Sequence, residues 1–352
     1  MVGKSEPGVV TLREVAEVAG VHPSTVSRAL NPATSHRVSK AVVRRISETA
    51  ERLGYRANLV AASLRTGRSH LIGILVPDIA NTVFSPILSG ASERLAAEGY
   101  LTVVADVPDG GRQLDLARSL VARQVEGLLL AAVTRDDPLV DYCIAQRLPA
   151  VLVNRSEARR RLSSVVSDDA LGMQLAVDHL MDLGHRAIAQ IGGPESTSTG
   201  YNRHRGFLAA IAARGLAPEA APCESAEAYA REAGQAAAHR LLEAHPEITA
   251  FVAANDLLAL GCYDALKARG LRCPADVSVV GHNDMPLVDL VAPPLTTVRI
   301  SHREMGWEAA DLLLQGMRDP SASTRTLVLA PQLVVRDSTA RPRTAARRRG
   351  AG

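Results

Sequence analysis

Residues 11–31 read TLREVAEVAGVHPSTVSRALN, and this stretch contains the start and stop signals of two short helices. Thr11 followed by Glu14 is the capping-box pattern that begins a helix. Gly20 supplies the residue type that most readily takes the left-handed conformation ending a helix. A second helix is predicted from Pro23, which is favoured at a first helical position, to Leu30. Two short helices joined by a glycine turn are typical of a helix-turn-helix.

The following residues add a third helix to this head. Ser39 is its predicted N-cap, and the helix runs to Leu53 with Gly54 at its C-cap. In the second helix, the apolar residues share an inward face, which leaves Ser24 and Arg28 pointing outward with the other hydroxyl side chains. Hydroxyls suit phosphate oxygens, and a guanidinium suits the edge of a guanine in the major groove. The alternative is a generic three-helix bundle whose polar face is simply solvated.

Composition and charge agree with a nucleic-acid partner for the head. The chain has 352 residues, of which 47% are hydrophobic and 22% charged, so two or three globular domains are expected rather than a disordered chain. Residues 1–70 hold 11 Lys/Arg against 5 Asp/Glu, a net charge of +6, whereas residues 71–335 hold 23 against 31, a net charge of −8. No apolar run reaches the length of a membrane span, and no secretory signal is visible, so we expect a cytoplasmic protein without membrane contact.

Between the head and the rest of the chain lies a short helical stretch. Residues 58–64 could form two helical turns, which the sequence from Arg65 to Ser69 then breaks. Because isolated helices this short are marginal in water, the stretch should fold only when something packs against it. We therefore predict a head at 9–56 and a hinge helix with its linker at 57–69.

From Leu71 onward, short apolar runs alternate with helical patterns, which predicts an α/β body of two doubly wound lobes at 70–339. The first lobe is assigned to about 70–167 and 299–324, and the second to about 168–298 and 325–339. A cleft is expected at the carboxyl ends of the strands. The basic residues 340–352 are expected to be a disordered tail.

No sequence motif in the body demands catalysis. It has no phosphate-binding glycine loop, no nucleophile elbow and no zinc motif, so no catalytic residue, metal or cofactor is predicted. The four cysteines are expected to be free thiols. Polar residues do follow several strands, for example Asp78, Asn154 and Asn283, and as a set at one cleft they favour binding of a ligand rich in hydroxyl groups. Taken singly, each could be a helix cap or a turn residue.

Residues Val10–Leu64 resemble the DNA-binding head of the lactose/galactose repressor family. The resemblance rests on residues 11–31 as quoted and on LGYRAN at 53–58, with Ala61 and Leu64 after it. The body, from Leu71 to about Thr339, resembles the family's effector domain, which is similar to periplasmic sugar-binding proteins. It does so through IGILVPD at 72–78, AND at 254–256 and DVSVVG at 276–281. Two departures stand in the head: His22 replaces the more usual serine, and the loop from Asn31 to Val38 has one extra residue.

The resemblance implies a homodimer that binds a pseudo-palindromic double-stranded operator and responds to a small molecule, a sugar or sugar derivative. Ser24 and Arg28 would contact base edges, and Leu64 would wedge the central base step from the minor groove. The full set implied to contact DNA is Thr11, Leu12, Arg13, His22, Pro23, Ser24, Thr25, Ser27, Arg28, Asn31, Ser39, Tyr55, Asn58, Ala61 and Leu64. The set implied to bind the effector is Asp78, Val83, Phe84, Asn154, Ser167, Arg203, Tyr229, Asn255 and Asn283.

Two other functions compete with a transcription repressor. A plain solute-binding protein would explain the body but not residues 1–68, and an enzyme acting on a sugar would need an acid/base pair that the sequence does not supply. The nature of the effector also stays open. A sugar acid would be favoured if Arg203 were not fully neutralised by its surroundings.

Overall fold

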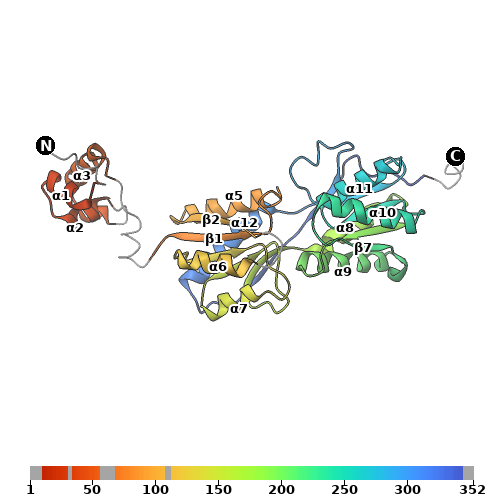
Figure 1. The fold of residues 1–352 in the computed structure, drawn as a ribbon, viewed down its shortest axis with the longest axis horizontal. Coiled ribbons are helices and arrows are strands. Elements are labelled where there is room, and N and C mark those ends of the chain that lie inside the picture. Colours follow the sequence, from red (N-terminus) through yellow and green to blue (C-terminus); the bar gives the residue numbers. More distant parts are fainter. Residues whose placement is uncertain (1–9, 31–33, 56–67, 108–111, 344–352) are drawn as a thin grey trace, which may run out of the picture. The chain divides into compact units, whose positions relative to one another are not determined.

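The computed structural model describes residues 10–30, 34–55, 68–107 and 112–343 (Figure 1). The chain divides into two units, residues 1–69 and residues 70–352, and each is considered by itself.

The head is a three-helix unit whose boundaries follow from its caps. Its helices are α1 (Leu12–Ala19), α2 (Pro23–Leu30) and α3 (Lys40–Leu53), with the 3₁₀ turn η1 (Ser35–Arg37) between the last two. The predicted capping box is confirmed, since the Thr11 amide donates to a Glu14 carboxylate oxygen and the Glu14 amide donates to the Thr11 hydroxyl. Gly20 ends α1 at φ 63°, in the left-handed region. Val15, Val26 and Ile46, one from each helix, are completely buried between them.

The first lobe is a parallel sheet covered on both faces. Its strands, in the order β11-β5-β4-β3-β1-β2, are Thr326–Leu329, Ser163–Ser167, Ala150–Val153, Gly127–Leu130, Leu71–Val76 and Leu101–Asp106. Helices α5 (Phe84–Ala96) and α12 (His302–Arg318) cover one face, and α6 (Gln113–Ala122) and α7 (Pro138–Ala145) cover the other (Figure 1). The central strands β1, β3 and β4 are nearly continuous apolar runs because both of their faces are buried.

The second lobe repeats this arrangement. Its sheet has the order β12-β10-β9-β8-β6-β7, formed by Gln332–Val334, Thr296–Arg299, Ser278–Asn283, Ala250–Ala253, Ile188–Gly192 and Cys223–Ser225, with only β12 antiparallel. Helices α8 (Asp169–Asp182) and α9 (Ser198–Ala213) cover one face, and α10 (Arg231–Ala244) and α11 (Asp256–Ala268) the other. A 3₁₀ turn, η2 (Pro218–Ala220), follows α9.

The chain passes between the lobes three times: after β5, after β10 and after β11. Two lobe boundaries predicted from sequence are therefore wrong. Strand β11 was assigned to the second lobe, but it pairs with β5 in the first, with Leu327 opposite Val165. Arg299 was assigned to the first lobe, but it pairs with Asn283 in the second. An apolar run predicts a strand but does not identify the strand with which it pairs. A strand's lobe is known only once its pairing partner is known.

The predicted disordered tail is also partly wrong. Residues 340–343 are held against the second lobe, where the Ala340 carbonyl accepts from the His185 ring at 2.8 Å and Arg343 forms an ion pair with Asp276. Residues 344–352 lie outside the described part of the chain.

Candidate functional site

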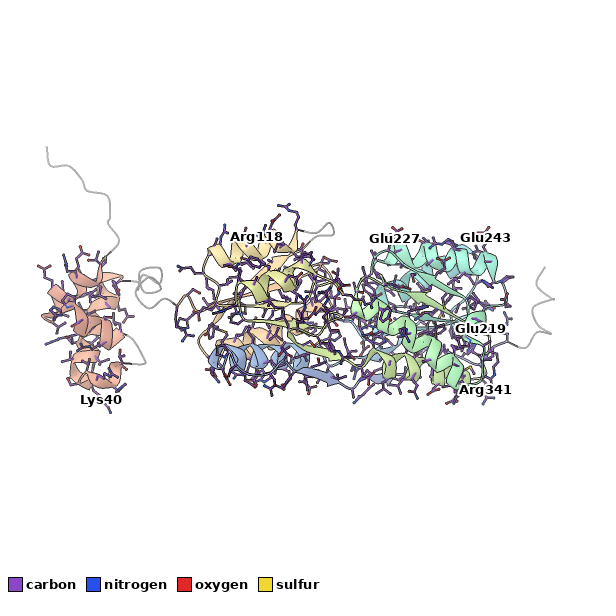
Figure 2. The ribbon with its side chains drawn as sticks, turned by 90° about the horizontal axis from the view of Figure 1, so that it is seen from below. Lys40, Arg118, Glu219, Glu227, Glu243 and Arg341 are labelled. Atoms are coloured by element: carbon purple, nitrogen blue, oxygen red, sulfur yellow. The ribbon has the colours of Figure 1, made fainter. Side chains whose placement is uncertain are left out.

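Helix α2 presents one polar face and buries the other. Val26 and Ala29 are buried, whereas Ser24 and Arg28 are exposed and lie one turn apart on the same side. A donor pair at this spacing can address neighbouring base edges from a helix lying in the major groove. Lys40, at the start of α3, adds a positive charge at the edge of the head (Figure 2).

His22 acts as the N-cap of α2, although histidine is an unusual residue at this position. Its ring Nδ1 accepts from the Ser24 amide at 3.2 Å and lies 2.8 Å from the Ser24 hydroxyl. The imidazole thus satisfies a backbone donor at the start of α2, which is the task of a serine or asparagine in most helices. It also holds the Ser24 side chain in place, so the departure at His22 bears directly on a predicted base-contacting residue.

The other residues predicted to contact DNA divide by exposure. Thr11, Arg13 and Ser39 are exposed, while Pro23, Thr25 and Ser27 are half-buried. Leu12 and Tyr55 pack against the core of the head. Asn31, Asn58, Ala61 and Leu64 lie outside the described residues. Contact of any of these residues with DNA stays a prediction.

The body contains a cavity of about 360 Å³ that is lined from both lobes. Eight of the nine predicted effector residues line it: Asp78, Val83, Phe84 and Asn154 from the first lobe, and Arg203, Tyr229, Asn255 and Asn283 from the second. Ser167 is not among the lining residues; its hydroxyl is buried and has no hydrogen-bond partner. Binding by all nine stays a prediction.

Sequence reasoning missed several lining residues. Gln113, Thr134, Thr197 and Thr199 also face the cavity. Three of them carry a signal that could have found them, because Gln113 begins α6, and Thr197 and Thr199 lie at the start of α9. Each of these helices follows a parallel strand, and that is where ligands of doubly wound sheets bind.

The charge of Arg203 is balanced inside the second lobe. Its Nε donates to Asp169 Oδ1 at 2.7 Å and its Nη1 donates to the Ala254 carbonyl at 2.6 Å, with both side chains of the ion pair buried. Burial raises the pKa of Asp169, and the guanidinium opposes that rise. The condition under which a sugar acid was expected is therefore not met. Arg203 keeps donors for neutral hydroxyls but brings no unbalanced charge.

Two asparagines direct amide groups toward the cavity. Asn255 caps α11 by accepting from the Leu258 amide at 2.9 Å, which leaves its NH₂ group for other partners. Asn283 has a φ of 110°, and its Oδ1 is buried without a hydrogen-bond partner. A buried acceptor without a partner is costly, so this atom is poised to accept from a ligand hydroxyl or a water. On the same lining, Tyr229 Oη lies 3.0 Å from the Thr199 hydroxyl.

Three buried titratable groups lie near Arg203. The rings of His282 and His302 are buried, and burial lowers the pKa of both, that of His302 to about 4, with the nearby Arg203 charge acting in the same direction. Burial raises the pKa of Asp256 to about 7, although its carboxylate accepts from the Thr297 hydroxyl and the Met285 amide. Both histidines are therefore neutral at pH 7.

Comparison with known proteins accounts for both units. Residues 11–58 match the family described as bacterial regulatory proteins, lacI family, and residues 177–339 match the periplasmic binding protein-like domain. The chain is 34% identical over 338 residues to the transcriptional regulator MalR of Streptomyces coelicolor, covering 94% of this chain and 96% of the relative. The chain belongs to the lacI family of bacterial regulatory proteins.

Two solved structures of similar proteins cover nearly the whole of this lacI-family chain. A lac repressor dimer bound to operator and the anti-inducer ONPF is 30% identical, with a TM-score of 0.84 over 95% of this chain and all of that one. A complex of the regulator CelR with cellobiose is 30% identical, with a TM-score of 0.72 over 94% and 99%. The predicted helix-turn-helix head and two-lobed α/β body are confirmed, and this lacI-family chain is a ligand-responsive DNA-binding transcription regulator. Within the described residues, no helix is long and apolar enough to cross a membrane.

Proposed function

We propose that the chain is a repressor acting in the cytoplasm, which binds a pseudo-palindromic operator as a homodimer and changes its DNA affinity when a neutral sugar occupies the cavity. The observation that carries this proposal is the cavity itself, lined from both lobes by amides, hydroxyls, carboxylates and two guanidinium groups, of which that of Arg203 is paired with Asp169. No catalytic role is proposed for these residues.

The chemistry of the cavity favours a neutral polyol over an anion. Asn255 and Asn283 offer amide groups, and Asp78 offers a carboxylate that can accept from two adjacent hydroxyls. Phe84 and Tyr229 supply aromatic faces for the C–H side of a sugar ring. An anionic ligand would meet the carboxylates of Asp78 and Glu227 as well as the guanidinium of Arg155, whereas Arg203 is already paired with Asp169. That the solved CelR complex contains cellobiose supports the same class of effector.

Control of DNA binding then follows from the two-lobed design. A ligand that bridges the lobes binds one arrangement of them better than another and shifts the population toward it. The segment 57–69 joins the body to the head, and we propose that it transmits the change. The similar lac repressor dimer bound to operator supports the dimeric, operator-bound form.

A thermal-shift screen of the full-length protein tests the effector class. Neutral sugars, sugar acids, phosphorylated sugars and nucleosides are each added in excess, and a ligand at about 100 times its dissociation constant adds about 2.7 kcal/mol to the free energy of unfolding. We expect a rise in melting temperature with neutral sugars only. A rise confined to sugar acids or sugar phosphates would contradict a neutral sugar as the effector, and no rise with any class would contradict a sugar effector.

A further inference from the structure

The two lobes also touch at the edge of the cavity. The guanidinium carbon of Arg135, in the first lobe after β3, lies 3.6 Å from the ring centroid of Tyr201, in the first turn of α9 in the second lobe. A guanidinium at this distance from an aromatic ring makes a favourable cation–π contact. Neither residue lines the cavity.

Two backbone amides cross between the lobes at the same place. The Arg135 amide donates to the Ser196 carbonyl at 2.8 Å, and the Ser156 amide donates to the Ser198 hydroxyl at 2.9 Å. The loops after β3 and β4 are themselves tied together, because the Ala158 amide donates to the Arg135 carbonyl at 2.8 Å. We call Arg135, Ser156, Ser196, Ser198 and Tyr201 the clamp.

The clamp is distinct from the segments that connect the lobes covalently. The chain crosses at β5 and β11 in the first sheet and at β10 and β12 in the second, which form one edge region of each sheet. The clamp joins the loops after β3 and β4 to the helix after β6, a strand three places from β10 in the sheet order. The crossovers can therefore serve as a hinge while the clamp opens and closes.

The clamp is continuous with the lining of the cavity. Thr134 and Arg155 line the cavity and immediately precede Arg135 and Ser156. Ser196, Thr197 and Thr199 line it from the start of α9. Any separation of the lobes that admits a ligand between these residues must lengthen the contacts of the clamp.

We propose that Arg135 and Tyr201 hold the cleft closed in the absence of ligand, so that the clamp must open before the lobes can separate. They are positioning residues, since they act through the placement of Thr134 and the start of α9. By raising the population of the closed arrangement, they also raise the affinity for a ligand that binds this arrangement. This consequence for the effector rests on the proposed function, whereas closure of the ligand-free protein does not.

Hydrogen–deuterium exchange of the ligand-free, full-length protein tests the clamp directly. The amides of Arg135 and Ser156 are the reporters, because each donates across the gap and neither is removed by a side-chain substitution. In Tyr201→Leu we expect both to exchange about two- to fivefold faster, since the ring's cation–π contact with Arg135 is lost, together with a more distant one with Arg205 at 5.7 Å. Tyr201→Phe is the matched control. It keeps the ring face and loses only the contact of Tyr201 Oη with Arg205, so exchange should stay at the wild-type rate.

A variant on the other lobe checks that the effect belongs to the pair. Arg135→Gln should accelerate the same two amides by the same factor, and the double variant should add nothing beyond either single one. Unchanged exchange in Tyr201→Leu or in Arg135→Gln overturns the proposal. So does acceleration spread through α8 and β6, which would make Tyr201 a residue of general stability. Selective acceleration in a protein that binds no sugar keeps the clamp and removes only the sugar effector.

Discussion

Arg28 is the single residue that best tests the predicted DNA contacts of the head. Its side chain is exposed at the end of α2, on the same side as Ser24, while its backbone carbonyl accepts from the Thr34 hydroxyl. Arg28→Ala should cost about 1–3 kcal/mol of operator binding, because a bidentate contact to guanine is lost. Fluorescence anisotropy with operator and with a scrambled duplex checks this. Equal affinity of the variant and the wild type for operator would show that Arg28 does not read it.

Asn283 is the sharpest single-residue test of the cavity. Its φ of 110° is unfavourable for a residue with a side chain, and its Oδ1 has no partner. Asn283→Gly should leave the melting temperature of the ligand-free protein unchanged or slightly higher, because glycine tolerates this backbone. We expect the same substitution to weaken binding of the effector sugar at least tenfold in calorimetry. Unchanged affinity would mean that Asn283 faces the cavity without binding its ligand.

His302 gives the body a defined pH dependence. Its folded pKa of about 4 lies below the ordinary value of 6.5, so the unfolded chain takes up the proton first as the pH falls. Protonation of His302 therefore leaves the free energy of unfolding unchanged well above pH 6.5 and lowers it as the pH falls toward 4. The loss is about 2 kcal/mol at pH 5. The groups around His302 are His282, Arg203 and Asp284.

Chemical denaturation at pH 8 and pH 5 checks this prediction. His302→Gln should lose less stability between these pH values than the wild type. Asp256→Asn should lose more, because the raised pKa of Asp256 makes the folded protein bind a proton in the same window and so opposes the loss. Identical slopes for the wild type and both variants would exclude these groups as the origin of the pH dependence.

At the scale of elements, the contact between α5 and α12 depends on two glycines. A Cβ on Gly306 would lie 1.9 Å from the Ile87 carbonyl oxygen, and one on Gly90 would lie 2.0 Å from the Arg303 carbonyl oxygen. Because these obstacles are backbone atoms, they cannot move aside as a flexible side chain would. The two helices can pack at this distance only with glycine at both crossings.

Gly306→Ala should therefore destabilise the body by at least about 2 kcal/mol, through overpacking. Gly316→Ala, on the same helix, is the matched control, since nothing lies within 4 Å of the added Cβ. It should stabilise the body by up to about 1 kcal/mol, because alanine favours a helix more than glycine does. The melting temperatures of the two variants should move in opposite directions. A shift of the same sign in both would refute the close approach of α5 and α12.

How far an element could be predicted from sequence depends on where its determinants lie. The capping box at Thr11 and the glycine turn at Gly20 act within three or four residues, so α1 was predicted to the residue. Each residue of β11 pairs with a residue of β5 that is 162 positions earlier in the chain, and no local pattern specifies this partner. The salt bridge of Arg203 with Asp169 is likewise invisible, because it joins two helices that only the fold of the second lobe brings together.

At the scale of the whole molecule, the head and the cavity belong to different units and must communicate through the segment that joins them. The residues of that segment that are predicted to contact DNA lie outside the described part of the chain. The body, by contrast, contains the two elements of the proposed switch: three crossovers between the lobes and a clamp of non-covalent contacts. A ligand and the clamp act on the same equilibrium between closed and open lobes, so a change in one alters the effect of the other.

Dimerisation is the other whole-molecule property, and the surface of the second lobe offers a test of it. Leu290 is 75% exposed and Leu287 is 66% exposed, in a loop that follows β9. Burying these side chains against a second copy would remove apolar area from water.

Leu290→Asp should shift the protein from dimer to monomer in analytical ultracentrifugation. It should also weaken operator binding, because two heads bound together reinforce each other. Ile144→Asp, at a side chain of α7 in the first lobe that is 43% exposed, is the matched control and should change neither property. A dimer that survives Leu290→Asp at micromolar concentration would place the interface on a different face of the body.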